Sequence, residues 1–454
     1  MAAALDLIDD VAAEIFLRLP PDEPEHLIRA SLVCKGWFRL LTDPDFLRRY
    51  RAFHRAPPLL GYIQRRRVIE GDPDPRLIPT TAVPLTPNPS FRRALDCRHG
   101  RVLLHVYGRV LHLLVWDPVT GERKRVSEPP IIWLIYSAAV FCAVSGCDHL
   151  NCHDGPFKVA FVATDERDDQ VKACVYSSET GAWTTPVILG NGCEAYVRHK
   201  QDAMDNGGVL GMFYTPYVQP RRVAVIGDGI YFTLRWGSAI VKYDLGKNCL
   251  SMIDPPAHDA YYIALMEMED SALGFACIQD WNLCLWSRKV GLEGDAEWIQ
   301  CKVIELEGMI PVDSPDDVAV VVGYAEGVGV IFVATDAGLF SFQLESGRMR
   351  KVDEPKVYFS ILPYMSFYTP DCGKAIACKV GERHVNIWLE QVQIIRSFKL
   401  KWAYHELEKL AKTLQNWKAP VKGDEMKKLV SCILKLRNQA NMTPRLGWPT
   451  DSVA

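Results

Sequence analysis

The sequence ASLVCKGW at residues 30–37 lies at the centre of a short helical region near the N-terminal end of the chain. Ahead of it, Val11, Ile15 and Leu19 recur at four-residue intervals, which predicts an amphipathic helix. Pro20 ends that helix, because proline lacks the backbone donor and clashes with the preceding turn. The downstream sequence consists mainly of short strand-like segments. We therefore expect a small helical module followed by a larger all-β domain.

Three further short helices are predicted in the same region. One covers about residues 23–30, one starts near Ser31, and one begins at Pro44 with Asp43 as its cap. About fifty residues of this kind cannot bury all their apolar side chains, so some should be available to a partner. The alternative is that the helices pack on the chain's own larger domain. The side chains concerned are Leu7, Val11, Ile15, Leu27, Leu32, Val33 and Trp37.

This region resembles the F-box. The resemblance rests on LIDDV at 7–11, EI at 14–15, RLP at 18–20 and LVCK with Trp37 at 32–37. ASLVCK at 30–35 and DPDFLRRY at 43–50 are similar to the version common in grass F-box families. Ile8 departs from the pattern, because the family usually has proline there to preset the entry into the first helix.

The resemblance implies an adaptor without chemistry of its own, so no catalytic residue and no cofactor is expected. Such a chain docks to a Skp-type adaptor and, through it, to the cullin and RING subunits of a ubiquitin ligase. The residues expected to bind the adaptor are Leu7, Asp10, Val11, Ile15, Leu19, Leu27, Leu32, Val33, Cys34 and Trp37. The alternative is a propeller scaffold whose F-box no longer docks, and failure to bind any Skp-type adaptor would favour it.

Composition sets the compartment and limits the partners. The chain has 454 residues, 24% of them charged, and a net charge of -3, so nothing drives it towards nucleic acid or a membrane. Its 14 cysteines are scattered, which favours a reducing compartment, the cytoplasm or the nucleus. The N-terminus lacks the basic region of a signal peptide. The uncharged run at 131–147 is too short to span a membrane and is interpreted as a buried strand.

From about residue 92 to 370 the chain repeats one pattern, an apolar strand followed by a hairpin whose turn contains Gly or Asn. The hairpins are expected at 115–123, 175–183, 242–250, 285–298 and 341–349. Four-stranded sheets of this kind have two apolar faces, and radial stacking into a β-propeller buries both. The alternative is a β-solenoid or two sandwiches.

We count five clear blades and allow a sixth. Residues 59–63 and 356–361 are the candidates to close the ring by pairing with each other. Residues 53–91 are otherwise expected to be a connector, and the prolines between 71 and 90 argue against regular structure there.

The repeated region resembles a known domain as well. ALDCRHGRVLL at 94–104, VWDPVTG at 115–121, ACVYSSETGAW at 173–183 and PYMSFYTP at 363–370 are similar to the kelch-like, F-box-associated propeller of the same plant proteins. That propeller is taken to recruit the target protein, and the residues that bind the target remain unknown. The expected domains are thus an F-box at 5–52, the connector at 53–91, the propeller at 92–370 and an extension at 371–454.

Two features remain. Cys142, Cys147, His149, Cys152 and His153 could supply zinc ligands, but their spacing fits no standard finger and Cys142 is expected to point into a strand. A loop with thiols by chance is the favoured interpretation, and no metal is predicted. In the extension, residues 403–417 and 426–440 show helical spacing, which predicts two antiparallel helices. Residues 396–454 carry 12 Lys and Arg against 5 Asp and Glu. Such basic helices either meet an acidic partner or a membrane surface, or pack on their own domain.

Overall fold

The structure of the chain is a computed structural model, and it divides into two units, residues 1–373 and 374–454. All described residues belong to the first unit. They are 10–66, 76–106, 112–165, 170–189, 193–206, 217–234, 239–256, 263–291, 296–311 and 317–371. Leu7, Ile8 and the two predicted C-terminal helices lie outside these ranges. No helix in the ranges combines the length and apolarity needed to cross a membrane.

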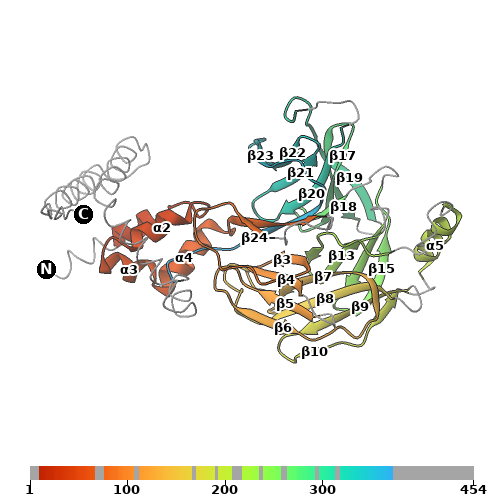
Figure 1. Ribbon diagram of the computed structural model, residues 1–454, viewed down its shortest axis with the longest axis horizontal. Coiled ribbons are helices and arrows are strands. Elements are labelled where there is room, and N and C mark those ends of the chain that lie inside the picture. The colour runs from red at the N-terminus through yellow and green to blue at the C-terminus, as the bar shows by residue number, and fades with distance from the viewer. Residues whose placement is uncertain are drawn as a thin grey trace, which may run out of the picture. The chain divides into compact units, whose positions relative to one another are not determined.

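The N-terminal module is helical, as predicted. After helical residues 10–16 come α2 (Pro24–Ser31), α3 (Lys35–Leu41) and α4 (Pro44–His54) (Figure 1). Asp43 caps α4, because its Oδ1 accepts hydrogen bonds from the backbone N–H groups of Asp45 (2.9 Å) and Phe46 (3.2 Å).

The predicted start of the third helix near Ser31 is wrong by four residues. Leu32 and Val33 form a turn after α2, and α3 begins only at Lys35. The reason is a local cap: the Cys34 Sγ accepts a hydrogen bond from the Trp37 backbone N–H at 3.4 Å. Because of this turn, Leu32 and Val33 lie between two helices rather than on the face of one.

Six sheets follow the helical module (Figure 1). The first sheet consists of β3 (Arg93–Arg98), β4 (Arg101–Val106), β5 (His112–Trp116) and β6 (Arg123–Val126). The second consists of β7 (Trp133–Cys142), β8 (Phe157–Asp165), β9 (Val171–Ser177), β10 (Ala182–Trp183) and β11 (Val187–Leu189). The third consists of β12 (Ala224–Ile226), β13 (Gly229–Thr233), β14 (Ile240–Asp244) and β15 (Cys249–Ile253). The next two consist of β16 (Ala264–Glu267), β17 (Leu273–Gln279), β18 (Asn282–Val290) and β19 (Ala296–Glu305), and β20 (Val320–Ala325), β21 (Val330–Thr335), β22 (Gly338–Gln343) and β23 (Met349–Asp353). A helix, α5 (Glu194–Asn206), lies in the connection from β11 to β12 and contacts β15.

The sixth sheet joins the two ends of this region. It consists of β2 (Leu77–Pro79), β1 (Leu59–Arg66) and β24 (Tyr358–Met365), in that order. β1 pairs antiparallel with β24, for example Ile63 with Leu362, so the predicted closing pair is confirmed. The proline-rich connector contains β2, which was not expected. Pro79 is compatible with it because β2 is an edge strand, where a missing donor disrupts no ladder.

Six apolar clusters close the six sheets into a ring. Each cluster draws its residues mainly from two neighbouring sheets, such as Leu103 of β4 with Phe161 of β8, or Phe332 of β21 with Ile361 of β24. The last cluster joins the closing sheet back to the first, through Leu362 and Val102. The domain is therefore a six-bladed β-propeller, and the solenoid and sandwich alternatives are wrong.

The turns of the predicted hairpins have the expected backbone. Gly121, Gly181 and Gly347 have φ of 73°, 68° and 66°, and Asn248 takes the same role with φ of 49°. The fourth predicted hairpin, at 285–298, is confirmed, because Arg288 of β18 pairs with Trp298 of β19. Its strands are longer than the predicted stretch, since Trp286 pairs with Gln300 in the middle of the ladder and β18 extends to Val290 before the chain turns.

The inner strands of the ring are β3, β7, β12, β16, β20 and β24, through which neighbouring sheets contact each other. The ends of these strands show on which face of the ring the helical module lies. The backbone N–H of Cys142, at the end of β7, donates to the His99 Nδ1 just after β3 at 3.3 Å. The Tyr364 hydroxyl, near the end of β24, donates to the Asp117 Oδ1 just after β5 at 3.3 Å. These ends therefore lie on one face of the ring, and α4 leads into β1 from that face. In the other five sheets, the connection from the outer strand to the next inner strand leaves from the other face.

Candidate functional site

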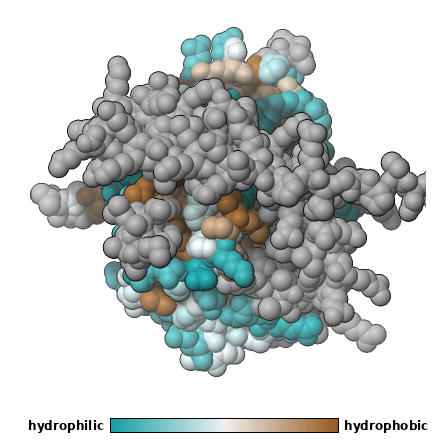
Figure 2. Space-filling model, turned by 90° about the vertical axis from the view of Figure 1, so that its left-hand side faces the viewer, coloured by the Kyte–Doolittle hydropathy of each residue, from teal (hydrophilic) through white to brown (hydrophobic). Residues whose placement is uncertain are grey.

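The helical module keeps part of its apolar surface open. Val33 is 56% exposed and Val11 is 38% exposed. Figure 2, which looks onto the left-hand end of Figure 1, shows hydrophobic residues next to hydrophilic ones on that face. The half-buried members of the predicted binding set are Ile15, Leu19, Leu32 and Trp37, and the other exposed members are Asp10 and Cys34. The predicted partner surface is thus not sealed by the described residues of the chain.

One residue of the predicted set lies elsewhere. Leu27 is 1% exposed and belongs to the core of the module, together with Leu41 and Phe46. It is not available to a partner, contrary to the prediction. The helical period places Leu27 on the apolar side of α2, and it does not show whether that side faces the module core or the partner.

An aromatic pair, Trp37 and Phe16, packs beside the open surface. The Trp37 ring lies edge-on to the Phe16 ring, with a centroid distance of 4.8 Å and an interplanar angle of 76°. The contact ties α3 to the first helical segment. The Tyr50 hydroxyl then donates to the Leu19 carbonyl at 3.0 Å, which fixes α4 against the turn that follows that segment. The carboxylate of Glu14 bridges Arg18 and Arg49 at the surface, which adds little stability because these groups are exposed.

The propeller completes the core of the helical module. Phe367, just after β24, is 6% exposed and packs in the module core beside Tyr50. Leu150, in the β7–β8 loop, packs against the same core. The buried Arg51 guanidinium donates to the Thr369 hydroxyl at 3.4 Å. These junction residues were not predicted, and the only signal for them was the family-like stretch at 363–370.

A buried charge network ties four blades together near the axis of the ring. The Glu326 carboxylate accepts from Arg98 at 2.6 Å and from Arg222 at 3.0 Å. Arg98 also donates to the Val223 carbonyl at 2.6 Å, and the Asp96 Oδ2 accepts from the Val140 backbone N–H. Burial alone would raise the pKa of Glu326, but the two guanidiniums outweigh burial and lower it to about 2. The carboxylate is therefore charged at neutral pH and works as a cross-link.

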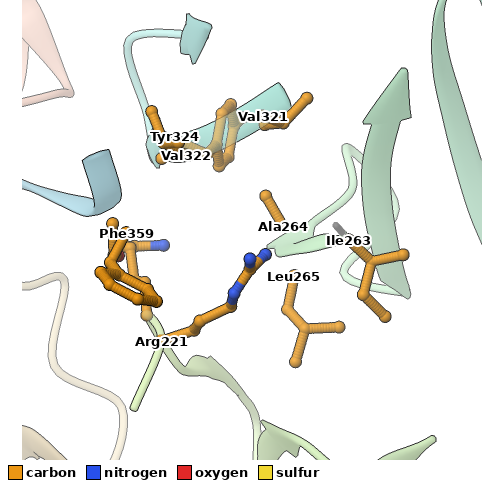
Figure 3. Close-up of a pocket in the computed structure, with 11 residues that line it drawn as sticks. Arg221, Ile263, Ala264, Leu265, Val321, Val322, Tyr324 and Phe359 are labelled. Carbon is orange, nitrogen blue, oxygen red and sulfur yellow. The ribbon is translucent and has the colours of Figure 1, made fainter. Parts of the chain in front are cut away.

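A small pocket lies between the inner strands β16, β20 and β24 (Figure 3). Arg221 points into it, and apolar residues such as Leu265, Val321 and Phe359 line its walls. The space inside is only about 10 Å³, which is room for about one water molecule. As the structure has it, this pocket cannot hold a small-molecule substrate.

Four of the five candidate metal ligands come together. Cys142, Cys147, His149 and Cys152 place their ligand atoms within 4.8 Å of one another. The expectation that Cys142 points away into its strand is wrong, because it is the last residue of β7 and its sulfur faces the loop that follows. His153 does not join the cluster, since its Nδ1 lies 2.9 Å from the Asp117 Oδ2.

The fold and the open helical surface define a chain with an F-box and a β-propeller. Residues 4–49 match the F-box domain family. Residues 93–371, more than half of the chain, match the family described as "F-box protein AT5G49610-like, beta-propeller". The chain belongs to this family of F-box proteins. The grass-type and kelch-like parts of the resemblance stay predictions.

Comparison with curated proteins gives no match. Among solved structures, the chain is similar to U3-55K with 8% identity, a TM-score of 0.32 and coverage of 60% of this chain and 67% of that one. A functionally unknown protein from Desulfotomaculum acetoxidans has 10% identity and a TM-score of 0.33, with coverage of 60% of this chain and 89% of that one. The WD40 domain of SCAP from fission yeast has 10% identity and a TM-score of 0.32, with coverage of 61% of this chain and 57% of that one. At these TM-scores the structural likenesses add nothing to the fold described above.

Proposed function

We propose that the chain is the substrate-receptor subunit of a Skp–cullin–F-box ubiquitin ligase. In this role the F-box binds a Skp-type adaptor, and the adaptor connects it to the cullin and RING subunits. The observation that carries the proposal is the open apolar surface around Val33 in a module that matches the F-box family. An F-box that had turned inward onto its own propeller would have buried that side chain.

The propeller would hold the target protein, and the chain itself would carry out no chemistry. The F-box occupies the face where the inner strands end, so among the described residues the opposite face is the one left for a target. That face carries the connection from β11 to β12, with α5 in it. The described cysteines are all free, which suits the reducing environment of the cytoplasm or nucleus.

The test replaces one open residue by a charge. Val33→Glu places a carboxylate where the adaptor would cover an apolar side chain. We expect a loss of about 2 kcal/mol or more of binding free energy, roughly thirtyfold in affinity. The measurement is the dissociation constant of the full chain with a purified Skp-type adaptor. Because Val33 touches little of the core, unfolding should not explain the loss.

Val357→Glu is the matched control. Val357 is 61% exposed and also lies outside helices and strands, but on the propeller. We expect it to bind the adaptor as the unmodified chain does. Equal binding by Val33→Glu and Val357→Glu would show that the open surface is not the docking site. No binding by the unmodified chain would favour the scaffold alternative. If the unmodified chain binds the adaptor, affinity purification with the proteasome inhibited would identify target proteins.

A further inference from the structure

The β7–β8 loop gathers three thiols and one imidazole at a single point. Cys142 and Cys152 are each 8% exposed, and Cys147 and His149 are half-buried. All four ligand atoms lie within 4.8 Å of one another, and the Cys152 Sγ lies 3.7 Å from the His149 Nδ1. Thiols that a surface loop carries by chance would not be expected to converge on one interior point.

These distances match a tetrahedral metal site. Zinc–sulfur bonds of about 2.3 Å set tetrahedral edges of about 3.8 Å between ligand atoms, so the cluster needs movements of about 1 Å at most. Soft thiolates with one imidazole favour zinc over magnesium or calcium. We propose that Cys142, Cys147, His149 and Cys152 form a structural Cys₃His zinc site. Four protein ligands fill the coordination sphere, so the site holds structure rather than a substrate.

The backbone of the loop is bent around the ligands. His149 has φ of 58° and Gly146 has φ of 69°. Both angles lie in the left-handed region, which residues other than glycine rarely adopt. The Cys142 Sγ accepts from the Val144 backbone N–H, and the Cys147 Sγ accepts from the His149 backbone N–H, each at 3.4 Å. These two contacts hold the sulfurs against the backbone of the loop.

The surroundings fit the charge and the orientation of such a site. Three thiolates and one zinc ion carry a net charge of -1, and the buried Arg101 guanidinium lies 3.9 Å from the Cys152 Sγ. The Arg101 guanidinium is fixed by the Cys152 carbonyl and by the Gly155 carbonyl, the latter at 2.9 Å. The His99 ring stacks on the His149 ring with centroids 3.8 Å apart, which holds the imidazole in place.

The position of the loop gives the site its role. Between its ligands the loop carries Leu150, which packs against the core of the helical module. Directly after Cys152 it carries His153, which contacts Asp117 in the β5–β6 turn of the first blade. A metal ion that fixes this loop therefore fixes the joint between the F-box and the propeller. The ion sets how rigidly one domain is held against the other.

The test is the metal content of the full chain, purified without a histidine tag from cells supplied with zinc. Elemental analysis should find about one zinc ion per chain. Cys147→Ala should lose it, whereas Cys147→His, which restores a fourth ligand at a half-buried position, should retain more zinc than Cys147→Ala. Cobalt loaded in place of zinc should give the intense visible bands of a tetrahedral thiolate site, and Cys147→Ala should lose these bands.

Two controls separate the site from its neighbourhood. His153→Gln changes the residue next to Cys152 but no ligand, and Cys301→Ser removes an exposed thiol of β19. Both should keep zinc. The proposal is overturned if the unmodified chain contains no stoichiometric zinc, or if Cys147→Ala keeps it. A disulfide among Cys142, Cys147 and Cys152 in the chain purified without reductant would overturn it as well. Removal of the ion by a chelator should increase cleavage by protease within residues 143–156, and unchanged cleavage would contradict the role at the joint.

Discussion

Trp37 has two tasks, because it packs on Phe16 and still leaves part of its ring at the open surface. Its removal should therefore lower both the stability of the helical module and its affinity for the adaptor. Leu32, at the turn before α3, is half-buried in the same way.

The double variant Trp37→Ala with Leu32→Ala should abolish binding of the Skp-type adaptor and lower the free energy of unfolding by about 2 kcal/mol or more. Trp298→Ala is the matched control. Trp298 is half-buried and lies edge-on to Phe275, with centroids 5.0 Å apart, but in the fourth blade after the F-box. It should lose comparable stability and keep the adaptor. Wild-type affinity in the double variant would mean that the docking surface lies elsewhere.

At the scale of single residues, sequence patterns located turns better than contacts. The glycines at 121, 181 and 347 were recognised because their positions need a positive φ, which is a local property. Leu27 and Cys142 were misjudged because the direction of a side chain depends on which elements pack around it. The convergence of Cys142 with three residues of the following loop depends on how β7 ends and how that loop folds back. Spacing along the chain does not contain that information.

Among the elements, the closing sheet depends on close backbone approach. A Cβ atom at Gly323 of β20 would lie 2.7 Å from the Ile361 carbonyl oxygen of β24. Neither backbone can move away easily, because each is held in its own sheet.

Gly323→Ala should therefore push β20 and β24 apart and lower the free energy of unfolding by about 2 kcal/mol. Gly246→Ala is the control, since its nearest atoms would lie 3.6 Å away and its φ is not positive. Thermal unfolding of the two variants gives the comparison. If both melt at the wild-type temperature, the contact between the closing sheet and its neighbour is looser than described here.

The elements themselves were largely predictable. β4 (Arg101–Val106) lies in the strand-and-hairpin repeat predicted from about residue 92, and Asp43 with Pro44 marks the start of α4, as predicted. The β18–β19 hairpin lies where it was predicted, but its strands are longer, because Trp286 lies in the middle of its ladder and not near a strand end as the aromatic residues of the other hairpins do. β2 was missed because prolines argue against strands in general, and its place at the edge of a sheet is a tertiary property.

For the molecule as a whole, Glu326 is the point where distant blades meet. It binds Arg98 from the first sheet after the F-box and Arg222 from the approach to β12. Its pKa is lowered from 4.5 to about 2, so the folded chain binds this proton less readily than the unfolded chain does. The resulting stability is fully present above about pH 4.5 and is lost as the pH falls towards about 2.

Glu326→Gln should lower the free energy of unfolding by about 3 kcal/mol at neutral pH, because two buried guanidiniums lose their counter-charge. The variant should also lose less stability than the wild type between about pH 6 and about pH 3. Glu14→Gln is the control, because Glu14 also bridges two arginines but is half exposed. Denaturant unfolding at several pH values measures both effects. A wild-type pH profile in Glu326→Gln would show that this carboxylate is not the group that titrates.

Phe367 follows β24, yet it fills the core of a module that occupies the first fifty or so residues. During synthesis, the ribosome therefore releases the F-box helices long before the side chain that completes them has been made. A message cut short ahead of codon 358 would yield neither a closed ring nor a helical module with a complete core. Only chains translated through the last blade would then carry a complete F-box core.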